Sequence, residues 1–236
     1  MRKPRKSQPR GRPFPARAVF RALWRAYGPQ GWWPGRTPFE VMVGAILTQN
    51  AAWINVERAI ARLRRRRALT PRALHALPER KLADLIRPAG YFRVKARRLR
   101  SLTGLLAGEF GGRLDRLFRL STAQLRERLL ATHGIGPETA DSILLYAAGR
   151  PVFVVDAYTR RVLQRHGWAR GDESYDELAA AFTRRLPRDT RLFNEYHALL
   201  VALGKRCCRP KPRCETCPLR RWPPLPERIQ SRGGAR

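Results

Sequence analysis

The fold is decided at residues 133–140, which read His133-Gly134-Ile135-Gly136-Pro137-Glu138-Thr139-Ala140. Upstream of them, Ser121 is a good N-cap and Gln124 occupies the capping-box position, so a short helix begins there. Downstream, Pro137 is a natural first helical residue, and apolar residues at helical spacing continue to Gly149. The stretch therefore predicts a helix, a tight glycine hairpin and a second helix.

The two glycines of the hairpin flank one aliphatic residue, Ile135, which we expect to be buried. Glycine allows positive φ angles and a close approach of the backbone to a ligand, while the following helix presents free amides at its first turn. Such an end can hold a phosphate group. An ordinary helix–helix turn is the alternative that Gly-X-Gly alone also allows.

An acidic residue follows the second helix. Residues Pro151-Val152-Phe153-Val154-Val155 form an apolar segment that we expect to be extended and buried, and the segment leads to Asp156. Asp156 stands at the start of a further helix, which contains Arg160 and Arg161. A carboxylate in that position is either an N-cap or a reactive group of a site.

Most of the remaining chain also predicts helices. Apolar residues recur at spacings of three and four, and strand signals are nearly absent, so we expect an all-α fold. The expected helices are a stripe from Phe39 to Leu47, one from Ile54 to Leu63, two short ones between Pro71 and Leu85 that are broken at Pro78, and one from Val94 to Leu106 that is closed by Gly108.

The charge of the chain favours a polyanionic partner. Its 49 Lys and Arg residues stand against 18 Asp and Glu, which gives a formal net charge of +31. We expect nucleic acid to be that partner, although an Arg-rich proteome would also raise the charge. The longest charge-poor apolar stretch, residues 41–56, contains Thr, Gln and Asn and is too polar to span a bilayer. The expectation is a monomer in the cytoplasm, on the nucleoid, without a membrane partner.

The chain divides into a folded part and two basic ends. Residues 1–15 are basic and Pro-rich without an apolar h-region, which predicts a disordered arm rather than a secretory signal. Residues 16–220 form the expected folded domain, and residues 221–236 form a basic tail. A loop at residues 205–218 holds all four cysteines, Cys207, Cys208, Cys214 and Cys217. Their clustering indicates a metal or cluster site, because stabilising disulfides would be spread along the chain.

The hairpin stretch, taken with Val154-Val155-Asp156-Ala157-Tyr158-Thr159-Arg160-Arg161-Val162, resembles the endonuclease III superfamily of helix-hairpin-helix (HhH-GPD) DNA glycosylases. The resemblance extends from about Thr37 to Cys217. It implies two helical lobes with a central cleft, into which a lesion base is flipped from the duplex. It also implies that Asp156 is the catalytic carboxylate, and that the hairpin grips the DNA backbone, often with a monovalent cation on loop carbonyls. The DNA-binding residues it implies are Gln49, Asn50, His133, Gly134, Ile135, Gly136, Thr139 and Arg160.

One residue departs from the bifunctional members of this superfamily. They carry a lysine that forms a Schiff base at the position where this chain has Glu138. A carboxylate cannot form a Schiff base, so the resemblance implies a monofunctional glycosylase in which Asp156 stabilises a cationic sugar and orients or deprotonates a water. A lyase that uses another lysine, and a non-catalytic DNA-binding relative, are the alternatives.

The aromatic residues bear on the choice of base. Trp32, Trp33 and Pro34 precede the helix that ends in Thr48-Gln49-Asn50, and Trp53 follows it. By pattern alone these residues are core packing. In this order they are similar to the 3-methyladenine glycosylase branch, which implies a base pocket of Trp32, Trp33, Pro34, Trp53 and Glu138 for a cationic alkylated purine. A pyrimidine or mismatch glycosylase remains the alternative.

The cysteine loop matches the superfamily's iron–sulfur loop only in part. The family spacing is C-x6-C-x2-C-x5-C, and Cys207, Cys214 and Cys217 satisfy its first three positions, whereas the fourth falls on Pro223. Cys208 is then the available fourth thiolate for a [4Fe–4S] cluster. Zinc held by four thiolates and the absence of any cofactor are the alternatives.

Overall fold

The computed structural model describes residues 12–226, which form helices and loops without a strand. Their helical structure confirms the expected all-α fold. The chain divides into two compact units. Unit 1 combines the two ends of the chain, Met1–Trp32 and Val155–Arg236, whereas unit 2 is the continuous segment Trp33–Val154. Trp32 and Trp33 therefore belong to different units. None of the helices within residues 12–226 has the length and apolarity needed to cross a membrane.

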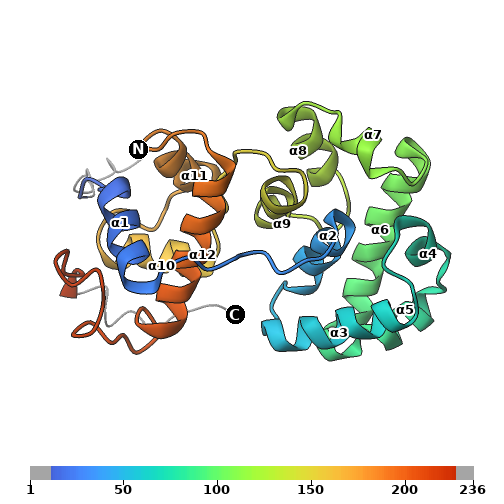
Figure 1. Ribbon diagram of the computed structural model, residues 1–236, viewed down its shortest axis with the longest axis horizontal. Helices are drawn as coiled ribbons and strands as arrows, with labels where there is room; N and C mark the ends of the chain where they lie inside the picture. Colours follow the sequence, from blue (N-terminus) through green and yellow to red (C-terminus); the bar gives the residue numbers. More distant parts are fainter. Residues whose placement is uncertain (1–11, 227–236) are drawn as a thin grey trace, which may run out of the picture. The chain divides into compact units, whose positions relative to one another are not determined.

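Unit 2 is built around one long helix. Its elements are α2 (Pro38–Leu47), α3 (Trp53–Arg65), α4 (Pro71–Ala76), α5 (Glu79–Leu85), the 3₁₀ turn η1 (Arg87–Ala89), α6 (Phe92–Phe110), α7 (Leu114–Phe118), α8 (Thr122–Leu130), α9 (Pro137–Ser142) and the π-helical turn η2 (Ile143–Ala147). Helix α6 packs against α2, α4, α5 and α7 (Figure 1). It is longer than expected at both ends. At its C-terminal end, Gly108 lies within the helix instead of closing it, and Gly111, at φ 60°, is the cap.

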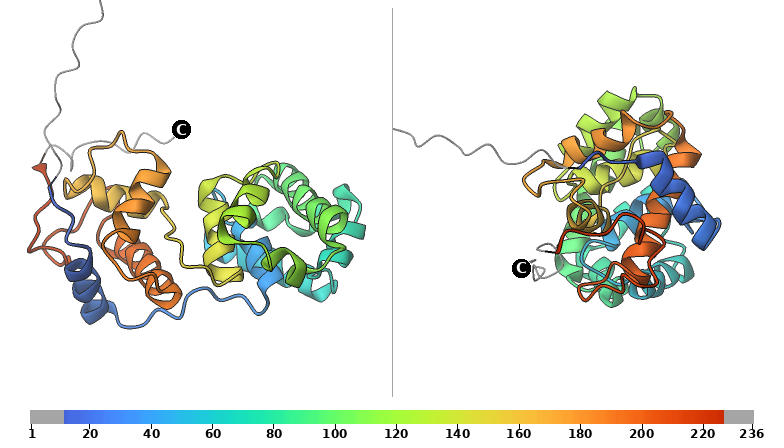
Figure 2. Two further views of the ribbon diagram at one scale, coloured as in Figure 1. Left: turned by 90° about the horizontal axis from the view of Figure 1, so that it is seen from above. Right: turned by 90° about the vertical axis from the view of Figure 1, so that its left-hand side faces the viewer.

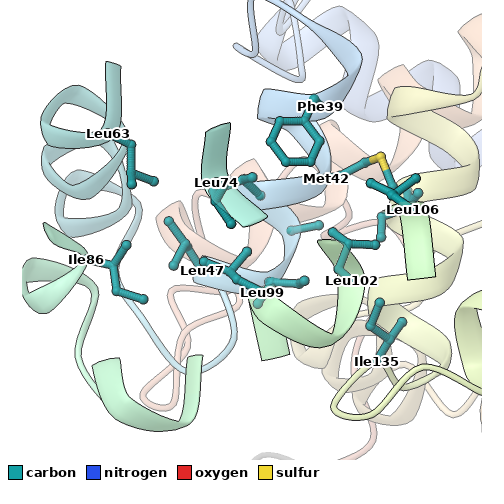
Figure 3. Packing of buried hydrophobic residues seen from close by; sticks show 14 of the residues in the cluster. Phe39, Met42, Leu47, Leu63, Leu74, Ile86, Leu99, Leu102, Leu106 and Ile135 are labelled. Atoms are coloured by element: carbon teal, nitrogen blue, oxygen red, sulfur yellow. The ribbon is translucent and has the colours of Figure 1, made fainter. Parts of the chain in front are cut away.

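The core of unit 2 is aliphatic. Phe39, Met42 and Leu47 of α2 point into the same space as Leu102 and Leu106 of α6 (Figure 3). Full burial of each such side chain stabilises the fold by about 1.5–3 kcal/mol. Ile54 lies in α3, the helix in which it was expected, and its side chain is 55% exposed.

Helix starts were the best-predicted local features. Ser121 and Gln124 form a capping box at α8, Pro137 is the first residue of α9, and Pro78 separates α4 from α5. The helix after the hairpin does not run unbroken to Gly149, however. It changes from α to π hydrogen bonding at Ile143, and Tyr146 lies within the π-helical turn.

Unit 1 consists of α1 (Ala16–Tyr27), α10 (Ala157–Arg165), α11 (Tyr175–Thr183) and α12 (Thr190–Arg206). Helix α12 packs against both α1 and α10, and the views of Figure 2 show α1 running beside it. Helices α10 and α12 approach each other closely at Gly204, where a Cβ atom would meet the Tyr158 ring at 2.3 Å. A glycine at that point lets α10, which begins after Asp156, lie directly on α12.

Residues at both edges of unit 1 also pack. The expected arm included Phe14, but its ring is buried against Trp168 and Phe182, at 5.2 Å and 4.9 Å between centroids. Burial of an aromatic ring against other rings removes a large apolar surface from water and stabilises the packed arrangement. Leu225, in the expected tail, donates its N–H to the Arg165 carbonyl. The remaining residues of the expected arm and tail, 1–11 and 227–236, lie outside the described range.

Candidate functional site

The hairpin has the expected form, but its two glycines differ in backbone conformation and in their surroundings. Gly134 has φ +83°, and a Cβ there would meet the Arg98 side chain at 2.2 Å. Gly136 has φ −92° and open space where a Cβ would be, so the expected positive φ holds for Gly134 alone. Ile135 is buried as expected, whereas His133 and Glu138 are exposed.

Gln49 ties the hairpin to the loop after α2. Its Nε2 donates to the Gly134 carbonyl at 3.1 Å and to Thr139 Oγ1 at 2.9 Å, and its Oε1 accepts from Arg98 Nη1. Both Gln49 and Thr139 therefore use their polar groups inside unit 2. The neighbouring Asn50 is exposed and has φ 52°, a strained backbone angle for a residue with a side chain.

Lys95 is a buried charged residue that the sequence analysis did not single out. It is 1% exposed, and its Nζ donates to the carbonyls of Leu47 at 2.8 Å and Ala89 at 2.7 Å. Burial and the nearby charge of Arg98 lower the pKa of Lys95 to about 8. Lys95 thus holds together the segments that lead to Asn50 and to Tyr91, which is 72% exposed at φ 45°. A lysine inside the apolar stripe of α6 was the available signal.

Three aromatic rings gather in unit 2. Trp33 lies edge-on to Trp53 at 5.2 Å between centroids and tilted against Tyr146 at 5.1 Å. A Cβ at Gly44 would meet the Trp33 ring at 3.2 Å, so this ring lies directly on α2. Tyr146, which comes from the π-helical turn, was not among the expected pocket residues.

Trp32 and Pro34 are two other expected pocket residues. Trp32 belongs to unit 1, where Lys205 Nζ lies 5.9 Å from its ring centroid. Pro34 is exposed. Each unit therefore presents one of the paired tryptophans.

Asp156 caps helix α10. Its Oδ1 accepts the Thr159 N–H at 2.7 Å, which confirms the N-cap interpretation. Its Oδ2 lies 3.7 Å from Nε2 of His197, a buried residue of α12. Burial lowers the pKa of His197, and the Asp156 carboxylate opposes that shift. The preceding Val155 donates its N–H to Tyr175 Oη at 3.3 Å, so both sides of Asp156 are fixed.

Three arginines of α10 donate hydrogen bonds to backbone carbonyls of unit 1. Arg160, an expected DNA-binding residue, donates from Nη1 to the Glu173 carbonyl at 2.9 Å. Arg161 donates from Nε to the Cys208 carbonyl at 2.7 Å. Arg165, further along the same helix, donates to the carbonyls of Arg209 and Pro210. Helix α10 thus carries Asp156 at its start and holds the cysteine loop along its length.

The four cysteines line one cavity, together with Arg165 and Leu219. The Cys208 thiol accepts from Arg165 Nη1 at 3.5 Å, and the Cys217 thiol accepts from the Leu219 N–H at 3.4 Å. Burial raises the pKa of Cys217 to about 11, and the neighbouring thiols add to the rise. Across residues 12–226, no three Cys, His, Asp or Glu side chains are placed so that they could hold a single metal ion.

Residues 43–188 match the model of the HhH-GPD superfamily of base excision DNA repair proteins. The chain belongs to this superfamily. A match of this extent spans the hairpin and Asp156. An HhH-GPD chain of this kind is a DNA glycosylase of base-excision repair, and it binds DNA.

Individual members of the HhH-GPD superfamily give finer comparisons. A Methanocaldococcus jannaschii protein, provisionally named as a DNA repair glycosylase, is 44% identical over 206 residues, which cover 86% of this chain and 93% of that protein. The H. pylori 3-methyladenine DNA glycosylase, solved with bound 1,N6-ethenoadenine, is 28% identical with a TM-score of 0.72, covering 80% of this chain and 96% of that one. Endonuclease III in a non-covalent DNA complex is 25% identical with a TM-score of 0.75, covering 88% and 92%.

Proposed function

We propose that this chain is a monofunctional glycosylase that hydrolyses the N-glycosidic bond of an alkylated purine, of the 3-methyladenine kind, in duplex DNA. The observation that carries the proposal is the aromatic cluster of Trp33, Trp53 and Tyr146. An alkylated purine is electron-poor and positively charged, and electron-rich ring faces attract it by stacking and cation–π interaction. The H. pylori relative acts on 3-methyladenine, which supports the same class of substrate here.

The reaction we propose uses Asp156 as its charged group. The C1′–N bond breaks, its electron pair leaves with the base, and the positive charge that develops on the sugar is stabilised by the Asp156 carboxylate. A water oxygen then bonds to C1′, and its proton passes to Asp156 or to solvent. Glu138 carries no amine, so this position supplies no Schiff base. The product is an abasic site.

Unit 2 supplies the grip on DNA in this proposal. The hairpin His133–Gly136 meets a phosphate through its backbone amides, and a monovalent cation on its carbonyls is part of the proposal. Because Gln49 is engaged inside unit 2, we assign the contact with the opened base stack to Asn50 and Tyr91. Both are exposed at positive φ, and Lys95 fixes the segments before them. We propose that the protein acts as a monomer on nucleoid DNA in the cytoplasm.

Base release from defined duplexes tests the substrate class. We expect the protein to free 3-methyladenine from methylated DNA, with little release from DNA that contains uracil, oxidised pyrimidines or thymine mismatches. Free base is scored by chromatography, and borohydride trapping on the same duplexes measures any Schiff base. Preferential release of an oxidised pyrimidine with efficient trapping would instead assign the chain an endonuclease III-like activity, as in the relative solved with DNA.

We further propose that the cysteine loop holds a [4Fe–4S] cluster with Cys208 as its fourth ligand. All four thiols line one cavity, and four thiolates are the ligand set that a [4Fe–4S] cluster takes. The Arg165 guanidinium and the Leu219 amide already donate to two of the sulfurs, as thiolates require. Such a cluster would fix the loop and the basic residues on it that face DNA phosphates, among them Lys211 and Arg213.

Replacing Cys208 by Ala tests the altered ligand set. We expect Cys208→Ala to lose iron, acid-labile sulfide and visible absorption as fully as Cys214→Ala, because each removes one of four thiolates. Iron and sulfide per chain are measured on anaerobically purified protein. Full iron content in Cys208→Ala would show that the adjacent cysteine is not a ligand. Zinc in place of iron, measured by elemental analysis, would favour the mononuclear alternative.

A further inference from the structure

His197 is a close neighbour of Asp156 to which the proposed reaction assigns no role. His197 lies near the middle of α12 and is 5% exposed, and its Nε2 is 3.7 Å from Asp156 Oδ2. Within residues 12–226 it is the basic side chain at ion-pair distance from Asp156. Arg160 and Arg161, on the helix that Asp156 caps, direct their guanidinium groups to carbonyls instead.

The two carboxylate oxygens of Asp156 have different surroundings. Oδ1 is used by the Thr159 N–H at the start of α10. Oδ2 is therefore the oxygen left to face a sugar cation or a water, and His197 is the group that borders it. A carboxylate held through one oxygen alone can still rotate about its last side-chain bond, whereas a donor at the second oxygen prevents this.

We propose that His197 is a positioning residue, which orients Oδ2 of Asp156 through a proton on its Nε2. The proposal rests on the catalytic role assigned to Asp156. A distance of 3.7 Å is longer than a hydrogen bond, and contacts of catalytic groups commonly shorten when substrate is bound. An uncharged imidazole can donate a proton to the carboxylate without cancelling the negative charge that the sugar cation needs. Burial favours that uncharged form.

A further buried polar group lies beside the pair of His197 and Asp156. Thr159, which is fully buried next to the capping contact, has a hydroxyl that makes no hydrogen bond among residues 12–226. Most buried polar groups in proteins are hydrogen-bonded, so an unbonded hydroxyl beside the capping contact requires an explanation. Tyr196, one residue before His197, instead has an ordinary structural bond from its hydroxyl to the Ala16 carbonyl at 2.9 Å.

Substitution of His197 tests the proposal on the full-length protein. We expect His197→Leu to slow single-turnover base release by about 10- to 100-fold, the scale of a small misplacement of a catalytic group, with unchanged affinity for a duplex that carries a stable abasic analogue. His197→Gln should recover most of the rate, because its amide N–H can reach Oδ2. Tyr196→Phe, which removes a buried hydrogen bond from the same helix, should keep the wild-type rate.

Equal rates in folded His197→Leu and wild type would overturn the proposal, and so would His197→Gln being as slow as His197→Leu. Nitrogen NMR of the wild-type histidine rings provides a readout that needs no activity. We expect His197 to carry its proton on Nε2, and Asp156→Asn to shift that resonance. A proton on Nδ1 alone would contradict the proposed donor. If wild type released no base from any duplex, the proposed function would fail, while the NMR result would still decide how His197 meets Asp156.

Discussion

Asp156→Asn is expected to abolish base release while leaving the fold and lesion binding intact. An amide of the same shape keeps an oxygen for the Thr159 N–H, and Asn is as good an N-cap as Asp. It carries no negative charge, so it neither stabilises a sugar cation nor accepts a proton from water. We expect single-turnover release to fall at least about a thousandfold, near the upper range for loss of a positioned charged group.

Asp189→Asn is the matched control for this change. Asp189 caps α12, and its Oδ1 accepts the Leu192 N–H at 2.9 Å. Both variants should melt within a degree or two of wild type, and Asp189→Asn alone should retain full activity. If Asp156→Asn kept a substantial rate, Asp156 would be reduced to a helix cap and the proposed mechanism would be wrong.

Gly134→Ala is expected to have the largest effect on stability among changes to the hairpin. Its φ of +83° strains any residue with a Cβ, and the new methyl group would lie 2.2 Å from the middle of the Arg98 side chain. Arg98 would have to move and release Gln49. The backbone strain and the overpacking together predict a loss of about 2–4 kcal/mol in the free energy of unfolding, measured by denaturant titration.

Gly136→Ala separates folding from DNA contact in the same hairpin. Its φ of −92° and the open space around it predict nearly wild-type stability. Any loss of duplex affinity in Gly136→Ala then reports the close approach of DNA to the hairpin backbone. Similar unfolding free energies for the two alanine variants would refute the different roles that we assign to the two glycines.

The two glycines illustrate which features of the hairpin could be predicted from local sequence and which could not. A glycine hairpin, a helix beginning at Pro137 and a cap at Asp156 are local features, and local sequence predicted them. That Gly134 rather than Gly136 needs positive φ depends on Arg98, which lies far away in the chain. The hydrogen bonds from Gln49 to Gly134 and Thr139 join residues 85 and 90 positions apart, so local sequence could not predict them either.

The partners of the candidate site were also set by tertiary packing. His197 meets Asp156 through the packing of α12 on α10, for which Gly204 leaves room beside Tyr158, and nothing near His197 in the sequence signals this contact. Tyr146 faces Trp33 from a π-helical turn, which the apolar spacing of residues 140–147 did not reveal. Phe14 was assigned to an arm by the prolines and charges around it, although its aromatic ring packs in unit 1.

The division of the chain has a consequence for the order in which the protein matures on the ribosome. Unit 2 is continuous, whereas unit 1 needs both ends of the chain. A nascent chain that has passed Val154 can complete the hairpin and its aromatic cluster, because domains fold as they emerge. Asp156 then caps α10, but His197 and the cysteine loop that α10 holds are among the last segments made. The residues proposed to contact DNA are therefore translated before His197, which is proposed to orient the catalytic carboxylate.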